Sequence, residues 1–211
     1  MLGARGGRRE FQALHDISIR LNDGDRVALL GRNGAGKTVL LKTLSGLLPP
    51  TEGYLQVSGN VLPAVDMSAG LVQKATCMQN IVLRGLSFGL RGKELKNYID
   101  DVAEFTELGD FLNSQINSLS AGMRSRFVVA TLNAINPEIL LMDEWISVAD
   151  KKIAEKQNGL LTKLVNKTRI FVLASHREAL VRAHCNKALV LDKGRIVFSG
   201  SVPDGLDYFK V

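Results

Sequence analysis

The sequence predicts an α/β fold in which a mostly parallel sheet is covered by helices, with a small antiparallel β subdomain and an inserted helical subdomain. Strand-like apolar runs alternate with helical stretches in the second half of the chain; the runs are 139–142, 170–174 and 188–191. Such alternation is typical of parallel sheets covered by helices. Residues from about 78 to 132 are instead mostly helical, so we expect a helical subdomain inserted within this core.

Ahead of the helical block, the pattern is mostly that of strands and turns. Residues 17–21 alternate apolar and polar side chains, and 22–25 form a turn signal before a short buried strand at 26–30. Residues 54–58 and 61–65 also have the composition of strands. We assign these last two segments to the small antiparallel β subdomain.

Periodicity predicts the helical block and the end of the chain as well. Residues 94–108 carry apolar side chains at the 3.6-residue spacing of an amphipathic helix, which Gly109 ends. Ser120 is a natural N-cap for an apolar helix that includes 127–132. A hairpin and a last strand over 192–199 complete the sheet.

Composition limits the classes of protein to which the chain can belong. Hydrophobic residues make up 45% and charged residues 23% of its 211 residues, which is ordinary for a globular domain. No apolar run approaches the ~18 residues of a membrane-spanning helix, and there is no basic-then-apolar leader. Cys77 and Cys185 have neither paired nor metal-type spacing, which fits a reducing compartment. We therefore expect a cytoplasmic protein without a membrane span of its own.

The net charge of +6 bears on the class of partner. Arg5, Arg8 and Arg9 form a basic cluster near the N-terminus. A basic surface can face nucleic acid, anionic lipid or a nucleotide. Aromatic residues are only 6% of the chain and are not interleaved with basic ones, as single-strand-binding proteins require. Spread over 27 Lys and Arg, such charge is most often a solvated surface; if it does bind a partner, we favour a membrane surface, and we expect no nucleic acid partner.

A phosphate-binding loop is the most specific motif. Residues 31–38 complete the pattern G-x-x-x-x-G-K-[ST] between the strand at 26–30 and a helix at 38–45. The glycines let backbone N–H groups turn toward a phosphate, and the helix N-terminus adds the positive end of its dipole. Lys37 is placed to reach the β- and γ-phosphates and Thr38 to ligate Mg²⁺. The predicted nucleotide-binding residues are Gly31, Arg32, Asn33, Gly34, Ala35, Gly36, Lys37 and Thr38.

Three further residues follow apolar strands at the edge where open α/β sheets bind ligands. Asp143 and Glu144 end the strand at 139–142, and His176 follows the strand at 170–174. Asp143 is the predicted Mg²⁺ ligand, because this cation prefers oxygen and keeps much of its hydration. Glu144 is the predicted general base for the attacking water. A neutral His176 can hydrogen-bond the γ-phosphate and hold that water.

The order of the motifs along nearly the whole chain resembles the ATP-binding subunit of ABC transporters, which is built on a P-loop NTPase core. A phosphate loop, a helical insert, Leu119-Ser-Ala-Gly-Met123, the Asp143–Glu144 pair and His176 follow one another with suitable spacing. Gly122-Met123 followed by Arg-Ser-Arg, together with Val148-Ala-Asp150, resembles the subgroup that exports capsular polysaccharide, O-antigen and related cell-surface glycans.

The resemblance implies a mechanism and partners. Residues 1–211 form one ABC ATPase domain, and two copies sandwich two ATP molecules with Mg²⁺. Ser120 and Gly122 of one copy cap the γ-phosphate bound by the other, and the loop at 148–150 joins the two copies. The helical subdomain, about 78–132, contacts separate multi-span permease subunits. The protein is therefore expected at the cytoplasmic face of the inner membrane, peripherally bound.

The chain departs from the family pattern at three places. The loop that usually presents a Gln to Mg²⁺ falls near Met67–Ser68, with Gln73 several residues later, and the catalytic-loop residue stays unassigned between them. Phe11 is the candidate for stacking on adenine but lies close to the phosphate loop. The first strand of the family pattern is not found before it, and we expect nothing in the sequence up to Val211 to select a glycan.

Three alternative functions stay open at this point. The same fold could drive export of another cargo, such as a lipid, drug or lipoprotein. A soluble ABC-type ATPase of DNA repair or translation is a second alternative, although such proteins generally carry paired domains or a long coiled-coil insert. A scaffold that binds ATP without hydrolysing it is the third, and the presence of Lys37, Asp143, Glu144 and His176 argues against it.

Overall fold

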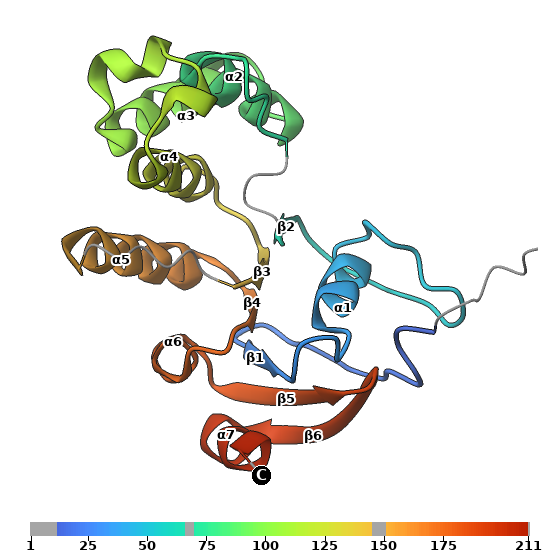
Figure 1. The fold of residues 1–211 in the computed structure, drawn as a ribbon. Coiled ribbons are helices and arrows are strands. Elements are labelled where there is room, and N and C mark those ends of the chain that lie inside the picture. The colour runs from blue at the N-terminus through green and yellow to red at the C-terminus, as the bar shows by residue number, and fades with distance from the viewer. Residues whose placement is uncertain (1–11, 66–69, 145–150, 211) are drawn as a thin grey trace, which may run out of the picture.

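One sheet organises the protein, whose computed structural model describes residues 12–65, 70–144 and 151–210. Its strands are β1 (Arg26–Leu30), β2 (Val61–Ala64), β3 (Ile139–Asp143), β4 (Ile170–Ala174), β5 (Lys187–Asp192) and β6 (Arg195–Ser201). They lie in the order β2-β3-β4-β1-β5-β6 (Figure 1). All neighbouring pairs are parallel except β5 and β6. The predicted mostly parallel α/β sheet is confirmed.

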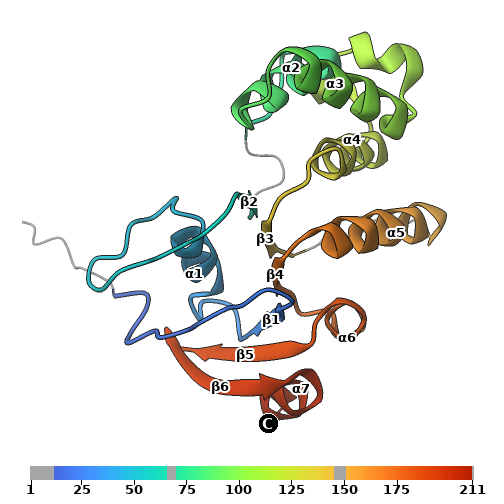
Figure 2. The ribbon, with the colours of Figure 1, turned by 180° about the vertical axis from the view of Figure 1, so that it is seen from behind.

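The strands alternate their side chains between two apolar layers. Helix α1 (Lys37–Leu44) lies on one face of the sheet, and α5 (Lys151–Lys167), α6 (Glu178–His184) and α7 (Val202–Lys210) lie on the other (Figures 1 and 2). In β3, Leu141 packs on the side of α1, whereas Leu140 and Met142 pack on the side of α5. Because both faces are covered, the central strands are continuous apolar runs instead of alternating ones.

The helical block lies between β2 and β3 in the sequence and has a core of its own. It contains α2 (Cys77–Ser87), α3 (Gly92–Thr106), two short 3₁₀ turns (Gly109–Asn113 and Ile116–Ser118) and α4 (Ala121–Asn133). Tyr98 and Val102 of α3 pack with Ile81 and Phe127 in that core, so the middle of the predicted stripe on this helix is buried, whereas Phe105 at its end is exposed. Both ribbon views place the block at the opposite end of the molecule from α7 (Figures 1 and 2).

The predicted antiparallel β subdomain is wrong in its details. Residues 54–58 are exposed and form no strand, and Val61–Ala64 joins the main sheet as an edge strand parallel to β3. An alternating segment becomes a strand only when its backbone finds a partner, and 54–58 pairs with none of the described strands. Pro63 has no N–H to donate, which suits an edge strand.

The alternating segment 17–21 is likewise no strand. Its apolar side chains, Ile17, Ile19 and Leu21, are partly buried against the apolar cluster on the α1 side of the sheet. The period of two therefore reports correctly which side chains face the core, although the backbone does not join the described sheet.

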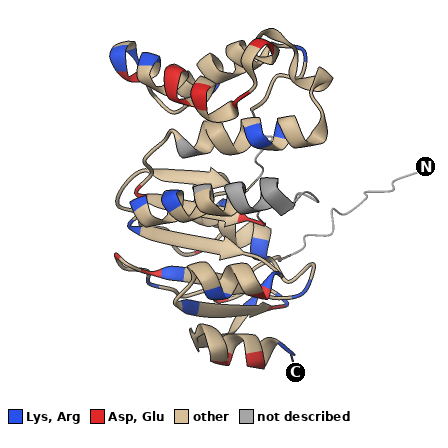
Figure 3. Cartoon of the chain, turned by 90° about the vertical axis from the view of Figure 1, so that its left-hand side faces the viewer, with Lys and Arg blue, Asp and Glu red and all other residues tan. Residues whose placement is uncertain are grey.

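Charged residues are mixed over the surface. In the view of Figure 3, Lys and Arg occur on the helical block, over the sheet and near the C-terminus, with acidic residues among them. The net charge of +6 therefore forms no single basic surface on that face.

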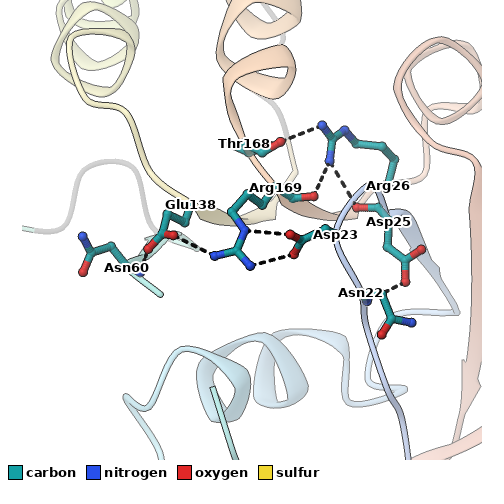
Figure 4. A network of polar contacts seen from close by, with 8 residues as sticks. All are labelled: Asn22, Asp23, Asp25, Arg26, Asn60, Glu138, Thr168 and Arg169. Carbon is teal, nitrogen blue, oxygen red and sulfur yellow. Dashed lines mark hydrogen bonds and ion pairs between the residues drawn. The ribbon is translucent and has the colours of Figure 1, made fainter. Parts of the chain in front are cut away.

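Arg169 links three segments at the end of the sheet where β4 begins (Figure 4). Its Nε and Nη2 donate to the two carboxylate oxygens of Asp23 at 3.0 and 2.9 Å, and Nη1 donates to Glu138 at 2.8 Å. Glu138 also accepts from the backbone N–H of Asn60 at 2.9 Å. That N–H bond and the Arg169 guanidinium lower the pKa of the Glu138 carboxyl.

We expect Arg169→Met to lower the melting temperature slightly, by about 2–4 °C at neutral pH, because exposed ion pairs contribute little each. A carboxyl with a lowered folded pKa stabilises the protein above its unfolded pKa, about 4.3 for Glu, and loses that effect as pH falls through the folded value. The difference between wild type and variant should therefore shrink below about pH 4. Melting curves from pH 3 to 8 test this, and a difference that is constant with pH contradicts it.

Candidate functional site

The predicted phosphate loop curls between β1 and α1. Gly36 is the N-cap of α1 and has a left-handed φ of 105°. A Cβ at this position would lie 3.0 Å from the carbonyl oxygen of Ala13 and 3.1 Å from the side chain of Leu14. Glycine therefore suits this position, and no side chain caps the start of α1, so its first N–H groups can bind a phosphate.

Lys37 lies inside the curl of the loop. Its Nζ donates to the carbonyl oxygens of Gly31 at 2.5 Å and Arg32 at 3.1 Å, and only 9% of the residue is exposed. Burial lowers the pKa of its ammonium group, against the opposing effect of the nearby carboxylates of Asp143 and Glu144. The structure therefore places a desolvated cation where the sequence predicts the β- and γ-phosphates.

Thr38 and Asp143 meet at the edge of the sheet. The Thr38 hydroxyl donates to Oδ2 of Asp143 at 2.5 Å, across 105 residues of sequence. A hydroxyl and a carboxylate in contact are hard oxygen donors, the kind that Mg²⁺ takes in proteins together with several waters. The side chains present thus fit the Mg²⁺ that the motif implies.

Glu144 and His176 face each other beside this pair. The backbone N–H of Glu144 donates to the carbonyl oxygen of Ala174 at 2.8 Å, which fixes the residue after β3 to the end of β4. The Glu144 backbone has a left-handed φ of 52°. Its carboxylate Oε1 lies 3.7 Å from Nε2 of His176, and both side chains are accessible, at 62% and 39%. One exposed acid and one exposed imidazole therefore share the edge of the site.

The turn between β5 and β6 supports the loop, a role that sequence reasoning missed. The Gly194 N–H donates to the carbonyl oxygen of Ala35 at 2.9 Å, and its own carbonyl accepts from the His15 N–H at 2.8 Å. The sequence predicted this hairpin but carries no signal that it touches residues near 13 and 35. His15 thus contributes through its backbone.

Gly194→Ala is expected to destabilise the protein and to weaken nucleotide binding. Gly194 has a φ of 77°, and a Cβ there would lie 2.5 Å from the Ala13 carbonyl oxygen. Left-handed strain and this overlap together should cost about 1–3 kcal/mol. Gly46→Ala is the matched control, because Gly46 has a φ of 74° and open space around it. Chemical denaturation should show the larger loss for Gly194→Ala, and equal losses would contradict the supporting role.

Ser120 and Gly122 lie in the helical block. The Ser120 hydroxyl caps α4 by accepting from the Met123 N–H at 3.2 Å, which confirms the predicted cap. Both ribbon views separate α4 from α1 (Figures 1 and 2), so these two residues do not join the phosphate loop of their own chain. In contrast, the structure brings together the loop, Asp143, Glu144 and His176.

Some of the predicted positions fall in parts of the chain that the structure does not describe. Phe11, Met67–Ser68 and the loop at 148–150 lie outside the described residues. Gln73 precedes α2, and its backbone carbonyl accepts from the Asn117 N–H at 3.2 Å. This contact ties the segment before α2 to the chain that leads to Ser120.

A phosphate loop on a parallel sheet, with a carboxylate pair and a histidine at the next strand tips, defines a nucleoside triphosphatase of the P-loop class. A model of the family "ABC transporter" matches residues 14–147, so the chain belongs to that family, and it is an ABC ATPase. The fold agrees with two solved structures. One is the dimeric structure of a post-hydrolysis state of the ATP-binding cassette MJ0796 bound to ADP and Pi (26% identity, 90% of each chain, TM-score 0.71). The other is an ATP-binding subunit of an ABC transporter (21% identity, 97% of this chain and 90% of that one, TM-score 0.76).

Curated relatives cover most of the chain. The O-antigen export system ATP-binding protein RfbE of Yersinia enterocolitica is 36% identical over 92% of this chain and 81% of its own length. The teichoic acids export ATP-binding protein TagH of Staphylococcus haemolyticus is 34% identical over 95% of this chain and 75% of its own length. The protein with the same name from Lactococcus lactis is 32% identical over 89% of this chain, which spans only 40% of that relative.

Proposed function

We propose that this chain is the ATP-hydrolysing subunit of an ABC exporter that moves a cell-surface polysaccharide, of capsule or O-antigen type, across the inner membrane. The observation that supports this cargo most strongly is the similarity to O-antigen and teichoic acid export proteins, at 30–36% identity over 87–95% of the chain. Both named cargoes are cell-surface glycans, in agreement with the subgroup to which the Gly122-Met123 pattern is similar.

The described side chains have distinct roles in the proposed reaction. Lys37 and the backbone of 31–38 bind the triphosphate, and Thr38 and Asp143 hold Mg²⁺, which neutralises charge on the phosphates. Glu144 accepts a proton from the attacking water, because its carboxylate is 62% exposed at the site and open to a water. His176, 3.7 Å from that carboxylate, hydrogen-bonds the γ-phosphate oxygen and so keeps the water and the phosphate aligned.

Two copies of the chain complete each site in this proposal. Ser120 and Gly122 lie far from the phosphate loop of their own chain (Figures 1 and 2), whereas the N-terminus of α4 is suited to a phosphate. A related cassette has a dimeric structure, which supports a homodimer in which each copy caps the other's nucleotide.

Coupling to transport requires a separate membrane protein. None of the helices in the described parts of the chain is both long and apolar enough to cross a membrane. We propose that the helical block, about 78–132, binds a multi-span permease and holds the chain peripherally at the cytoplasmic face of the inner membrane.

A deletion strain tests the proposed cargo. Removing the chain should leave the polysaccharide inside the cell, and expression of the wild type should restore it to the surface, whereas a Lys37→Met variant should not. Surface and intracellular polysaccharide are measured separately by immunoblotting or sugar analysis. Normal export in the deletion strain would contradict the proposal and direct attention to another cargo.

A further inference from the structure

The C-terminal helix α7 is held firmly against the sheet. Val202 and Leu206 are buried with residues of β1, β5 and α6. A Cβ at Gly205 would lie 2.4 Å from the Cβ of Ala188, so the helix approaches β5 as closely as a glycine allows. At its start, Ser201 Oγ donates to Asp204 Oδ2 at 2.6 Å. The helix is therefore held in one position on the sheet, and its last turn can restrict the residues that it contacts.

That last turn reaches the segment that carries His176. The rings of Phe209 and His176 are 6.4 Å apart between centroids, with a tilt of 36° between their planes. The next residue, Lys210, places its Nζ 3.4 Å from Oε2 of Glu178. Glu178 also accepts from Arg182 at 2.8 Å. Two consecutive residues of α7 thus lie next to His176, in the segment after β4, and Glu178, the first residue of α6.

A ring contact suits a histidine that must act through its nitrogen atoms. Aromatic rings at 4.5–7 Å attract one another in tilted arrangements, and such a contact restricts the side-chain torsions without using a hydrogen-bond donor or acceptor. His176 therefore has the Phe209 ring as one neighbour and the Glu144 carboxylate, at 3.7 Å, as another. Its nitrogen atoms stay available for a phosphate and a water.

We propose that Phe209 and Lys210 are positioning residues that hold His176 in its working orientation. This inference rests on the role proposed for His176 in ATP hydrolysis. Phe209 restricts the imidazole directly, and Lys210 holds the backbone after it through Glu178. The end of α7 thereby influences the rate at which the chain hydrolyses ATP, through His176.

The test measures steady-state ATP hydrolysis by the full chain in two backgrounds. In the wild-type background, Phe209→Ala should lower kcat by on the order of tenfold with little change in KM, because small misplacements of a catalytic group slow the reaction strongly. In the His176→Ala background, Phe209→Ala should change kcat by less than about twofold, since it acts through a side chain already removed. Phe209→Tyr should retain the ring and most of the rate.

Tyr208→Ala is the matched control. Tyr208 lies on the same helix and stacks on Phe198 at 5.3 Å, so its loss disturbs α7 packing without removing the contact with His176. Lys210→Met is the second variant for the case in which Phe209→Ala melts below the assay temperature, and it should lower kcat in the wild-type background only.

The outcomes separate this inference from the function on which it rests. If His176→Ala hydrolyses ATP slowly but neither Phe209→Ala nor Lys210→Met changes kcat, the positioning role is wrong and the proposed role of His176 stands. Equal losses for Phe209→Ala in both backgrounds, or for Tyr208→Ala, also overturn the positioning role. If His176→Ala hydrolyses ATP at the wild-type rate, both proposals fail.

Discussion

Glu144→Gln should slow ATP hydrolysis by about 10²–10⁴-fold, the usual contribution of a general base, and leave ATP binding intact. Gln has the same shape and keeps an oxygen acceptor, but it cannot take a proton from water. The hydrogen bond that anchors this residue, from its backbone N–H to Ala174 at 2.8 Å, does not involve the side chain. The variant should therefore fold normally and fail only at the chemical step.

Binding should be as tight as in the wild type, or tighter. The Glu144 carboxylate lies close enough to Lys37 to affect its pKa, so it also repels an incoming phosphate. Removing that charge while blocking hydrolysis should produce a long-lived, ATP-bound dimer. Light scattering after gel filtration with Mg²⁺-ATP measures the dimer, and calorimetry measures the affinity.

Glu94→Gln is the matched control for this prediction. Glu94 is exposed in the first turn of α3, within the helical block. Its replacement by Gln is the same chemical change at a position outside the site. This variant should hydrolyse ATP at the wild-type rate and form no stable dimer. Hydrolysis at an undiminished rate by Glu144→Gln would show that another group activates the water.

The sequence was enough to predict that the residues at the tips of neighbouring parallel strands lie close together. β3 and β4 pair in parallel with Asp143 opposite Ala174, so residues that end these two apolar runs must meet at one edge. The same reasoning places Thr38, which follows β1 after the loop, near Asp143, and the structure shows their hydrogen bond at 2.5 Å. Local apolar runs, with the rule that the ends of parallel strands meet at one edge, were sufficient to predict which residues meet there.

What the sequence could not predict depends on distant partners. Residues 54–58 have the composition of a strand but pair with no described strand, and the local pattern of a segment does not show whether its backbone finds a partner. The contact between Gly194 and Ala35 joins two turns that are separated by more than 150 residues. Neither turn reveals this contact in its own sequence, because a backbone hydrogen bond does not require particular side chains.

Ser120 and Gly122 illustrate a second limit of prediction from sequence. The sequence predicted a capped helix correctly, but a cap is formed whether or not its N-terminus also receives a phosphate. The structure of one chain holds these residues away from the phosphate loop, as Figures 1 and 2 show. Their role in a second copy therefore stays a prediction for the dimer that Glu144→Gln should trap.

Lys37→Met should weaken ATP binding by about 100-fold or more. Two hydrogen bonds from a cation to phosphate contribute roughly 1.5 kcal/mol each or more, and 1.4 kcal/mol is a tenfold change in affinity. Met has a similar length but no charge and no donor. Arg32 and the other loop residues stay in place, so the loss measures the contribution of the ammonium group itself.

Loss of binding must be separated from loss of folding, and the pKa of Lys37 allows this. Burial lowers that pKa, which means that the folded protein disfavours the charged form relative to the unfolded chain. The charged ammonium thus lowers stability at neutral pH, and this cost declines only as pH rises above the lowered pKa toward that of the unfolded chain. Lys37→Met should therefore melt at the wild-type temperature or slightly above it when no nucleotide is present.

Thermal melts with and without Mg²⁺-ATP distinguish the two effects. The wild type should melt at a higher temperature with nucleotide, since binding to the folded state stabilises it, and Lys37→Met should show no such rise. Lys42→Met, in the last turn of the same helix, should keep the rise and serves as the control for removing a lysine from α1. If Lys37→Met keeps the full rise, the triphosphate is not held by this loop, and the roles assigned to Thr38, Asp143 and Glu144 lose their basis. If its nucleotide-free form instead melts well below the wild type, the two carbonyl contacts of Lys37 stabilise the loop by more than burial of its charge costs.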